Sequence, residues 1–222
     1  MGYVSFNLQL AGKPIVVVGG GSVAQRKVGN LLPAQPGIVL VSPTVTFELQ
    51  QWRESGAIRH LPRRFEPDDL AGAFLAIAAT NDREVNRQVA EEANRRGILV
   101  EVTDNPALGN VTSPALIRQG DLAIAISTNN KSPALSAAIK RELAPLFGPE
   151  YARSLDLLGA VREKLLTAGA VNTYNKQVLT DLAEQLPALF AADATDEIDR
   201  LLQKHLGADC RLATFQSETG EN

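Results

Sequence analysis

The chain has 222 residues, of which 45% are hydrophobic and 21% are charged, and its formal net charge is −3. This length suits one nucleotide-binding domain with a smaller appendage, and the slightly negative charge excludes a general attraction to nucleic acid or to anionic membranes. The single cysteine excludes an internal disulfide and a multi-cysteine metal site. No apolar run could span a bilayer and the N-terminus does not resemble a signal peptide, so we expect a soluble cytoplasmic protein.

Strand-like and helix-like segments alternate through the first half of the chain. The apolar run at 15–18 predicts a strand, and apolar side chains on one face predict a helix at 22–32. The same patterns predict strands at 38–41, 58–61, 74–79 and 98–102, and helices at 47–54 and 83–96. The alternation predicts an α/β fold with a Rossmann-type, doubly wound parallel sheet over residues 1–112.

The pattern changes after Asp104. Residues 114–118 predict a short helix and residues 122–127 a further strand. Ser132 and Pro133 then predict the cap and the first position of another helix. We therefore expect a small α+β segment between the sheet domain and the rest of the chain.

The last third of the sequence is helical in pattern. One apolar stripe predicts the core of a helical bundle within a C-terminal domain at 148–206; it consists of Leu157, Leu158, Val161 and Leu165. Residues 207–222, which include Cys210, are predicted to form a polar, disordered tail.

Three glycines connect the first predicted strand to its helix. Gly19 and Gly21 fit the pattern Gly-x-Gly-x-x-Ala, in which the first glycine allows a tight bend and the second leaves room for phosphates. Ala24 lets the helix lie close to the strand, and the positive N-terminus of that helix then faces the phosphate charge. The motif predicts a dinucleotide site, and a purely structural glycine turn is the alternative.

The end of the second predicted strand lacks the acidic residue that usually binds ribose hydroxyls in such folds. Ser42 and Thr44 stand there and can donate hydrogen bonds to the ribose. No arginine on that loop favours a 2′-phosphate, so NAD is expected rather than NADP. Thr80 follows two small residues at the end of the strand at 74–79, which suits close approach of the cofactor; a plain junction capped by Asn81 is the alternative.

Asp104 is the candidate catalytic carboxylate. It follows the strand at 98–102 and therefore lies at the carboxyl edge of the sheet, where ligands of open α/β folds bind. There it could act as a general base or acid, or it could simply cap the turn that contains Pro106. His60 and His205 are expected to be structural, and we find no metal-ligand cluster in the sequence.

Several segments together resemble one family. They are Gly19-Gly20-Gly21-Ser22-Val23-Ala24-Gln25-Arg26-Lys27, then Ala78-Ala79-Thr80-Asn81-Asp82, then Val102-Thr103-Asp104, then Ser127-Thr128 with Ser132-Pro133. In order and spacing they resemble the precorrin-2 dehydrogenases, which also form the N-terminal module of sirohaem synthases. The resemblance covers roughly the first 145 residues.

The resemblance implies NAD-dependent oxidation of precorrin-2 to sirohydrochlorin, on the route to sirohaem and in some organisms to cobalamin. It implies NAD contacts at Ser22, Val23, Pro43 and Thr44, an essential aspartate at Asp104, and homodimerisation through 113–147. Some members also insert ferrous iron. The residues that we expect to bind the tetrapyrrole are Asn110, Thr128, Lys131 and Ser132.

The chain departs from the family pattern at Asn129 and Asn130, where relatives carry two glycines. Asparagine tolerates left-handed backbone better than most residues, so the turn can form, although two side chains then occupy space that a large substrate would need. An NAD-sensing regulatory module without turnover is the alternative from another functional class. Such modules typically carry the ribose-binding acid that is missing here.

Overall fold

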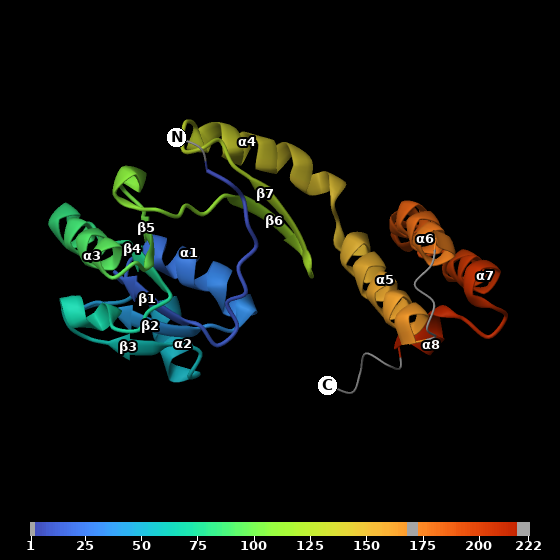
Figure 1. The fold of residues 1–222 in the computed structure, drawn as a ribbon, viewed down its shortest axis with the longest axis horizontal. Helices are drawn as coiled ribbons and strands as arrows, with labels where there is room; N and C mark the ends of the chain where they lie inside the picture. Colours follow the sequence, from blue (N-terminus) through green and yellow to red (C-terminus); the bar gives the residue numbers. More distant parts are fainter. Residues whose placement is uncertain (1–2, 168–172, 217–222) are drawn as a thin grey trace. The chain divides into compact units, whose positions relative to one another are not determined.

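The computed structural model describes residues 3–167 and 173–216. The chain divides into two compact units, Met1–Ser113 and Pro114–Asn222, each of which is described by itself below (Figure 1).

The first unit is built on a five-stranded parallel sheet with the strand order β3-β2-β1-β4-β5. Its strands are β1 (Pro14–Val18), β2 (Gly37–Val41), β3 (Arg59–Leu61), β4 (Leu75–Ala78) and β5 (Leu99–Val102). Its helices are α1 (Ser22–Leu31), α2 (Phe47–Glu54) and α3 (Arg83–Arg95), with short 3₁₀ turns at Leu32–Ala34, Pro67–Leu70 and Pro106–Leu108. The predicted doubly wound sheet is confirmed.

The register of the sheet brings the ends of its strands to one edge. Val18 at the end of β1 pairs with Val41 of β2 on one side and with Ala78 of β4 on the other. Ala78 in turn pairs with Val102, the last residue of β5. The segments that follow these four strands therefore all begin at the same carboxyl edge, which is where open α/β sheets bind ligands.

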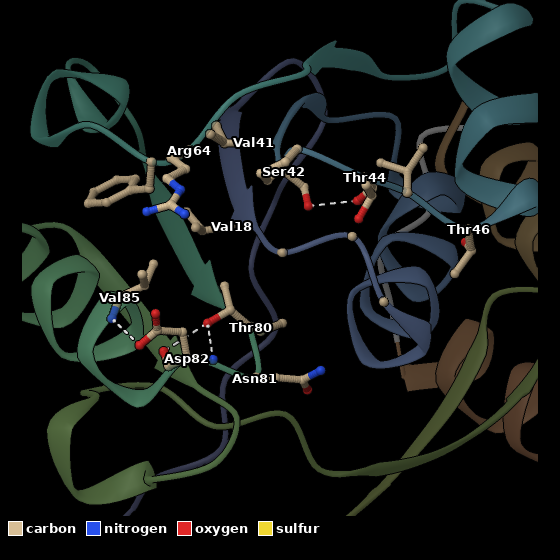
Figure 2. A pocket seen from close by; sticks show the side chains of 17 residues that line it. Val18, Val41, Ser42, Thr44, Thr46, Arg64, Thr80, Asn81, Asp82 and Val85 are labelled. Atoms are coloured by element: carbon tan, nitrogen blue, oxygen red, sulfur yellow. Dashed lines mark hydrogen bonds between the residues drawn. The ribbon is translucent and has the colours of Figure 1, made fainter.

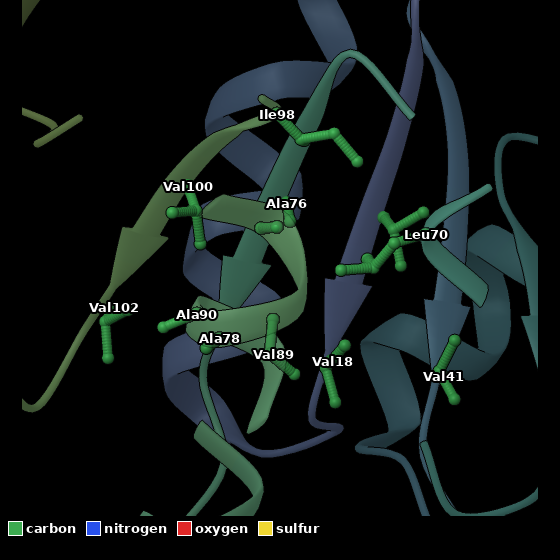
Figure 3. Close-up of a cluster of buried hydrophobic side chains, with 12 residues drawn as sticks. Val18, Val41, Leu70, Ala76, Ala78, Val89, Ala90, Ile98, Val100 and Val102 are labelled. Carbon is green, nitrogen blue, oxygen red and sulfur yellow. The ribbon is translucent and has the colours of Figure 1, made fainter. Parts of the chain in front are cut away.

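Side chains of alternate residues along each strand pack on opposite faces of the sheet. On one face, valines and alanines of β1, β4 and β5 pack against the apolar side of α3, as Figure 3 shows. On the other face, Ile15, Val17 and Ile77 pack with Ala24 and Val28 of α1. Ala24 is fully buried, as expected for a small residue that lets α1 lie close to the strand.

A polar network connects the end of the first unit to its sheet and to α1. Glu101 of β5 accepts hydrogen bonds from the backbone N–H and the hydroxyl of Ser113, both at 2.8 Å. Lys27 of α1 forms an ion pair with the same carboxylate, with Nζ 2.7 Å from Oε1. This network binds the last residue of the unit to both a strand and a helix.

The second unit begins with an antiparallel hairpin of β6 (Ala115–Gln119) and β7 (Leu122–Ile126). The helix expected at 114–118 is therefore wrong. Gln119 pairs with Leu122, so Gly120 and Asp121 form a two-residue turn, with Gly120 at a positive φ of 55°. Such a turn is typical of tight hairpins.

After the hairpin, the described residues of the second unit are mainly helical. It contains α4 (Pro133–Leu143), a 3₁₀ turn at Ala144–Leu146, α5 (Pro149–Thr167), α6 (Thr173–Ala191), α7 (Thr195–Leu206) and α8 (Leu212–Gln216). Ser132 caps α4, since its side chain accepts a hydrogen bond from the N–H of Leu135 at 3.1 Å, as predicted. The predicted stripe on α5 also forms core, because Leu157 and Val161 are buried and Leu158 and Leu165 pack against them.

The expectation of a disordered tail is wrong for residues 207–216. Helix α8 lies within this stretch, and Cys210, Leu212 and Phe215 are buried in the same core as α5, α6 and α7. These three apolar side chains explain the order, because burying them stabilises a segment that is otherwise polar. Residues 217–222 lie outside the described chain.

Within the described ranges, none of the helices combines the length and the apolar character that crossing a membrane requires.

Candidate functional site

A cavity of about 550 Å³ opens at the carboxyl edge of the sheet. Its lining comes from the ends of β1, β2 and β4 and from the segment after β3, as Figure 2 shows. The volume lies within the range typical of small-molecule sites. Among the residues expected to contact the cofactor, Gly19, Gly21, Ser42, Pro43, Thr44 and Thr80 line it.

The glycine turn lines this cavity, and the space around each of its three glycines differs. Gly19 has a φ of 121°, and a Cβ there would lie 2.2 Å from the carbonyl oxygen of Ala79. A Cβ on Gly20 would lie 1.9 Å from the carbonyl oxygen of Thr44. At Gly21, by contrast, an added Cβ would meet no heavy atom of the described chain within 4 Å. The first two glycines are thus required by packing, and the third leaves open space at the cavity.

The N-terminus of α1 borders this open space. Gly21 is the N-cap residue, and within the described chain no side chain caps the helix and no acidic residue lies in its first turn. Ser22 and Val23, which begin the helix, are exposed. Backbone N–H groups at such a terminus attract anions, so this end of the cavity suits a pyrophosphate. These observations fit the cofactor that the glycine pattern predicts.

The segment after β2 lines the cavity beside the glycine turn, and the N–H of Thr46 donates to the carbonyl oxygen of Gly20 at 3.0 Å. The Ser42 hydroxyl donates a hydrogen bond to the carbonyl oxygen of Thr44 at 2.7 Å, so its proton is engaged within the loop. Thr44 is exposed at the cavity and is therefore the better ribose partner of the two. His60 of β3 donates from Nε2 to the carbonyl oxygen of Ser42 at 2.8 Å, which is a structural contact, as expected.

Arg64 is a cavity residue that the sequence reasoning missed. It follows β3 and points into the cavity near Val18 (Figure 2). Its neighbour Arg63 donates to both carboxylate oxygens of Asp69, including Oδ2 at 2.8 Å, which orders this segment. Burial raises the pKa of Asp69, but the hydrogen bonds from Arg63 and from the Glu66 backbone outweigh it and hold that pKa below its usual value. The signal in the sequence was the basic pair following a strand at the same sheet edge.

Asp104 follows β5 and is joined to the cavity by hydrogen bonds. Asn86 of α3 donates from Nδ2 to Oδ1 of Asp104 at 2.8 Å and to the carbonyl oxygen of Thr80 at 3.0 Å. Asn86 Oδ1 accepts from the N–H of Thr80 at 3.1 Å. Asp104 itself is not among the described residues that line the cavity, so its connection to the cofactor site runs through Asn86 and Thr80.

The Asp104 carboxylate remains accessible from solvent, with 32% of the side chain exposed. Nε of Arg83 lies 4.0 Å from Oδ2, on a side chain that is itself 93% exposed. An ion pair this exposed contributes little stabilisation. The carboxylate is therefore held in place mainly by Asn86 and keeps an oxygen that can accept a proton.

The residues expected to bind a large substrate fall in two places. Asn110 lies after β5, and its side chain accepts from the N–H of Val100 at 2.7 Å and donates to the carbonyl oxygen of Ile98 at 3.3 Å. These bonds fasten the loop to β5, so the amide already has structural partners. Thr128, Lys131 and Ser132 form one turn in the second unit, where Thr128 Oγ1 accepts from the N–H of Ser132 at 3.2 Å.

The same turn contains the two asparagines that stand where the family resemblance leads us to expect glycines. Asn129 and Asn130 have φ values of 52° and 60°, which is the left-handed conformation that asparagine was expected to tolerate. Helix α4 begins directly after this turn, and Lys131 is exposed beside it. An exposed cation next to a helix N-terminus favours a bound carboxylate.

Asn86 was the most informative residue that sequence reasoning missed. It is 1% exposed and lies on the face of α3 that also buries Val89, Ala90 and Ala93. A polar residue at a core-facing helix position needs hydrogen-bond partners, and that mismatch was the available signal. Over the described residues, no group of three or more His, Cys, Asp or Glu side chains is arranged to hold a metal ion.

Two family models match this chain. One is described as putative NAD(P)-binding and matches residues 6–115. The other is described as sirohaem biosynthesis protein central and matches residues 119–145. Together they cover the sheet domain, most of the hairpin and all of α4.

Several curated relatives are sirohaem synthases. The siroheme synthase 2 of Aeromonas salmonicida is 33% identical over 227 residues, which covers 100% of this chain and 45% of the relative. The siroheme synthase of Chromobacterium violaceum is 40% identical over 146 residues, which covers 66% of this chain and 31% of the relative. The chain spans less than half the length of these relatives.

A solved structure described as SirC, precorrin-2 dehydrogenase, is similar over almost its whole length. The TM-score is 0.74 and the sequence identity 27%, and the match covers 90% of this chain and 98% of that one. The similarity extends beyond the sheet domain into the second unit, since it spans most of both.

Proposed function

Because the chain belongs to the sirohaem biosynthesis family, with matches at residues 6–115 and 119–145, we propose that it oxidises precorrin-2 to sirohydrochlorin with NAD. The observation that carries the proposal is the carboxylate of Asp104, which Asn86 connects to Thr80 at the edge of a dinucleotide-type cavity. The similarity to a precorrin-2 dehydrogenase over 98% of that protein supports the same reaction.

NAD supplies the acceptor for the hydride in this reaction. The residues present fit it: the α1 N-terminus and the open space at Gly21 suit the pyrophosphate, and Thr44 suits a ribose. Arg64 adds a positive charge to the same cavity. We propose that Ser22, Val23 and Pro43, which border these groups, complete the cofactor contacts.

Asp104 supplies the second requirement of the oxidation. Removing two electrons from precorrin-2 releases one hydride and one proton, and the proton needs a base. Oδ1 of Asp104 accepts a hydrogen bond from Asn86, which leaves Oδ2 for that proton. Asp104 follows β5, and β5 is the neighbour of β4 in the sheet. The residues directly after β4 line the cofactor cavity, so the base follows the strand next to them.

We propose that the second unit binds the carboxylates of the macrocycle. Lys131 and the N-terminus of α4 are accessible, and Thr128 and Ser132 shape the turn that presents them. We further propose a homodimer formed through residues 113–147, as in the family. Exposed apolar side chains in and beside that segment, such as Leu135 at 52% and Leu146 at 61%, support it. Sedimentation of a monomer at micromolar concentration would contradict the dimer.

The test is turnover of precorrin-2 by the purified chain under anaerobic conditions. We expect NAD-dependent formation of sirohydrochlorin, followed by its absorbance, with NAD preferred over NADP. An NAD-sensing module, the alternative functional class, would bind NAD in calorimetry yet leave precorrin-2 unchanged. That outcome would contradict the proposed function. The sirohaem synthase relatives favour the enzyme.

Insertion of ferrous iron is a separate activity that needs its own assay. Chelation requires loss of two pyrrole protons, and Asp104 is the accessible carboxylate that could assist it. The measurement compares iron insertion into purified sirohydrochlorin with and without the protein. A rate equal to that without protein would limit the proposal to the dehydrogenase.

A further inference from the structure

Asn86 is a buried polar side chain whose two donors and acceptor oxygen all have hydrogen-bond partners. Its Oδ1 accepts from the N–H of Thr80 at 3.1 Å, and its Nδ2 donates to the carbonyl oxygen of Thr80 and to Asp104. The Thr80 hydroxyl lies 2.8 Å from Oδ1 of Asn86 and 2.9 Å from the carbonyl oxygen of Asp82, so these two acceptors share its one proton. This satisfaction of a side chain that is 1% exposed indicates a specific arrangement.

The backbone of Thr80 determines which way this amide faces. A backbone N–H can only donate, so it must meet the oxygen of Asn86, and a backbone carbonyl can only accept, so it must meet the nitrogen. The remaining N–H of Asn86 is then directed at Asp104, at 2.8 Å from Oδ1. The reverse orientation would place an oxygen against both a carbonyl and a carboxylate.

This orientation has a chemical consequence for Asp104. The hydrogen bond from Asn86 occupies one lone pair of Oδ1 and makes that oxygen less basic. Protonation of Oδ2, which receives no hydrogen bond from Asn86, is therefore favoured for the proton taken from the substrate. Since Thr80 lines the cofactor cavity, the same amide fixes the accepting oxygen relative to the cofactor site.

We propose that Asn86 is a positioning residue of the dehydrogenase, which orients the Asp104 carboxylate so that Oδ2 faces the proton to be removed. This inference rests on the proposed function. In the step concerned, the substrate loses a hydride to NAD and a proton to Oδ2, which later releases it to water. Asn86 contacts neither the substrate nor the proton and acts through Asp104.

Two variants test the role of the Asn86 donor. Asn86→Asp keeps the shape and the oxygen facing Thr80 but replaces the NH₂ group. Asn86→Ser is too short to reach Asp104. We expect kcat to fall by about 10²-fold in both, the effect of misplacing a reacting group by about an ångström. The KM for precorrin-2 should change by less than about threefold, because Asn86 acts through Asp104 and does not itself contact the substrate. Both variants also lose bonds to Thr80, which lines the cofactor cavity, so kcat is measured at saturating NAD.

A matched control is Gln88→Glu, which makes the same amide-to-acid change on the exposed face of α3. It should leave kcat unchanged. If Asn86→Asp does not fold, judged by its thermal transition and NAD binding, Asn86→Ser carries the test. The decisive comparison places Asn86→Ser in the Asp104→Asn background, where we expect no further loss of activity because the group it positions is gone.

The outcomes separate the two proposals. A wild-type chain that does not oxidise precorrin-2 refutes the proposed function and this inference with it. If the wild type is active while both Asn86 variants retain its kcat, only the positioning role is refuted. Losses that multiply with those of Asp104→Asn would likewise refute it, since Asn86 would then act independently of Asp104.

Discussion

Replacing Asp104 with asparagine is expected to lower kcat by at least about 10²-fold, the usual contribution of a general base. The substitution removes the basic oxygen while its own carbonyl can still accept the hydrogen bond from Asn86. The side chain is 32% exposed and its ion pair with Arg83 spans 4.0 Å, so folding should be little affected. Steady-state turnover of precorrin-2 measures the effect.

The control for Asp104→Asn is NAD binding measured by calorimetry. We expect an affinity within about threefold of wild type, because Asp104 does not line the described cavity. Asp104→Ala should show the same loss of turnover and also removes the contact to Asn86. Turnover at the wild-type rate in either variant would exclude Asp104 as the base.

Replacing Gly21 with alanine is expected to weaken NAD binding without harming the fold. The Cβ would meet no described heavy atom within 4 Å, and the backbone at φ −86° and ψ −173° accepts alanine. The new methyl group would occupy the space where the pyrophosphate approaches the backbone. Overpacking of this kind costs about 1–3 kcal/mol, which corresponds to an affinity loss of about 5- to 150-fold. Calorimetry with NAD checks it.

Gly20→Ala is the matched comparison, because its effect should fall on stability. Its Cβ would lie 1.9 Å from the carbonyl oxygen of Thr44, so the loop after β2 must move. We expect a lower Tm for Gly20→Ala and an unchanged Tm for Gly21→Ala. If Gly21→Ala binds NAD as tightly as wild type, the pyrophosphate does not lie at this turn.

The sheet domain could be predicted from the sequence because its signals are local. Buried parallel strands appear in the sequence as continuous apolar runs. Because the strands are parallel, the segments that follow them all begin at the same edge of the sheet. Gly19, Thr44 and Thr80 could therefore be assigned to one sheet edge, where they line the cavity, while Asp104 follows β5 at the same edge but does not line it. The strand at 115–119 was missed because a short apolar run fits either helix or strand, and the Gly120-Asp121 turn was the deciding signal.

Long-range contacts account for what the sequence could not supply. The requirement for glycine at position 20 comes from Thr44, and the role of Asn86 comes from Asp104, 18 residues later. Arg64 enters the cavity from the segment after β3, because β3 pairs with β2 and ends at the same sheet edge. Residues 207–216 read as polar, but three apolar side chains there complete the core of the helical unit.

A single anaerobic turnover tests the central claim most directly. Enzyme in excess is mixed with NAD and precorrin-2, and NADH and sirohydrochlorin are followed together by absorbance. We predict equal amounts of both products, formed at the same rate by the wild type and at least about 10²-fold more slowly by Asp104→Asn. Sirohydrochlorin formed without NADH, or products appearing equally fast in both proteins, would contradict the account.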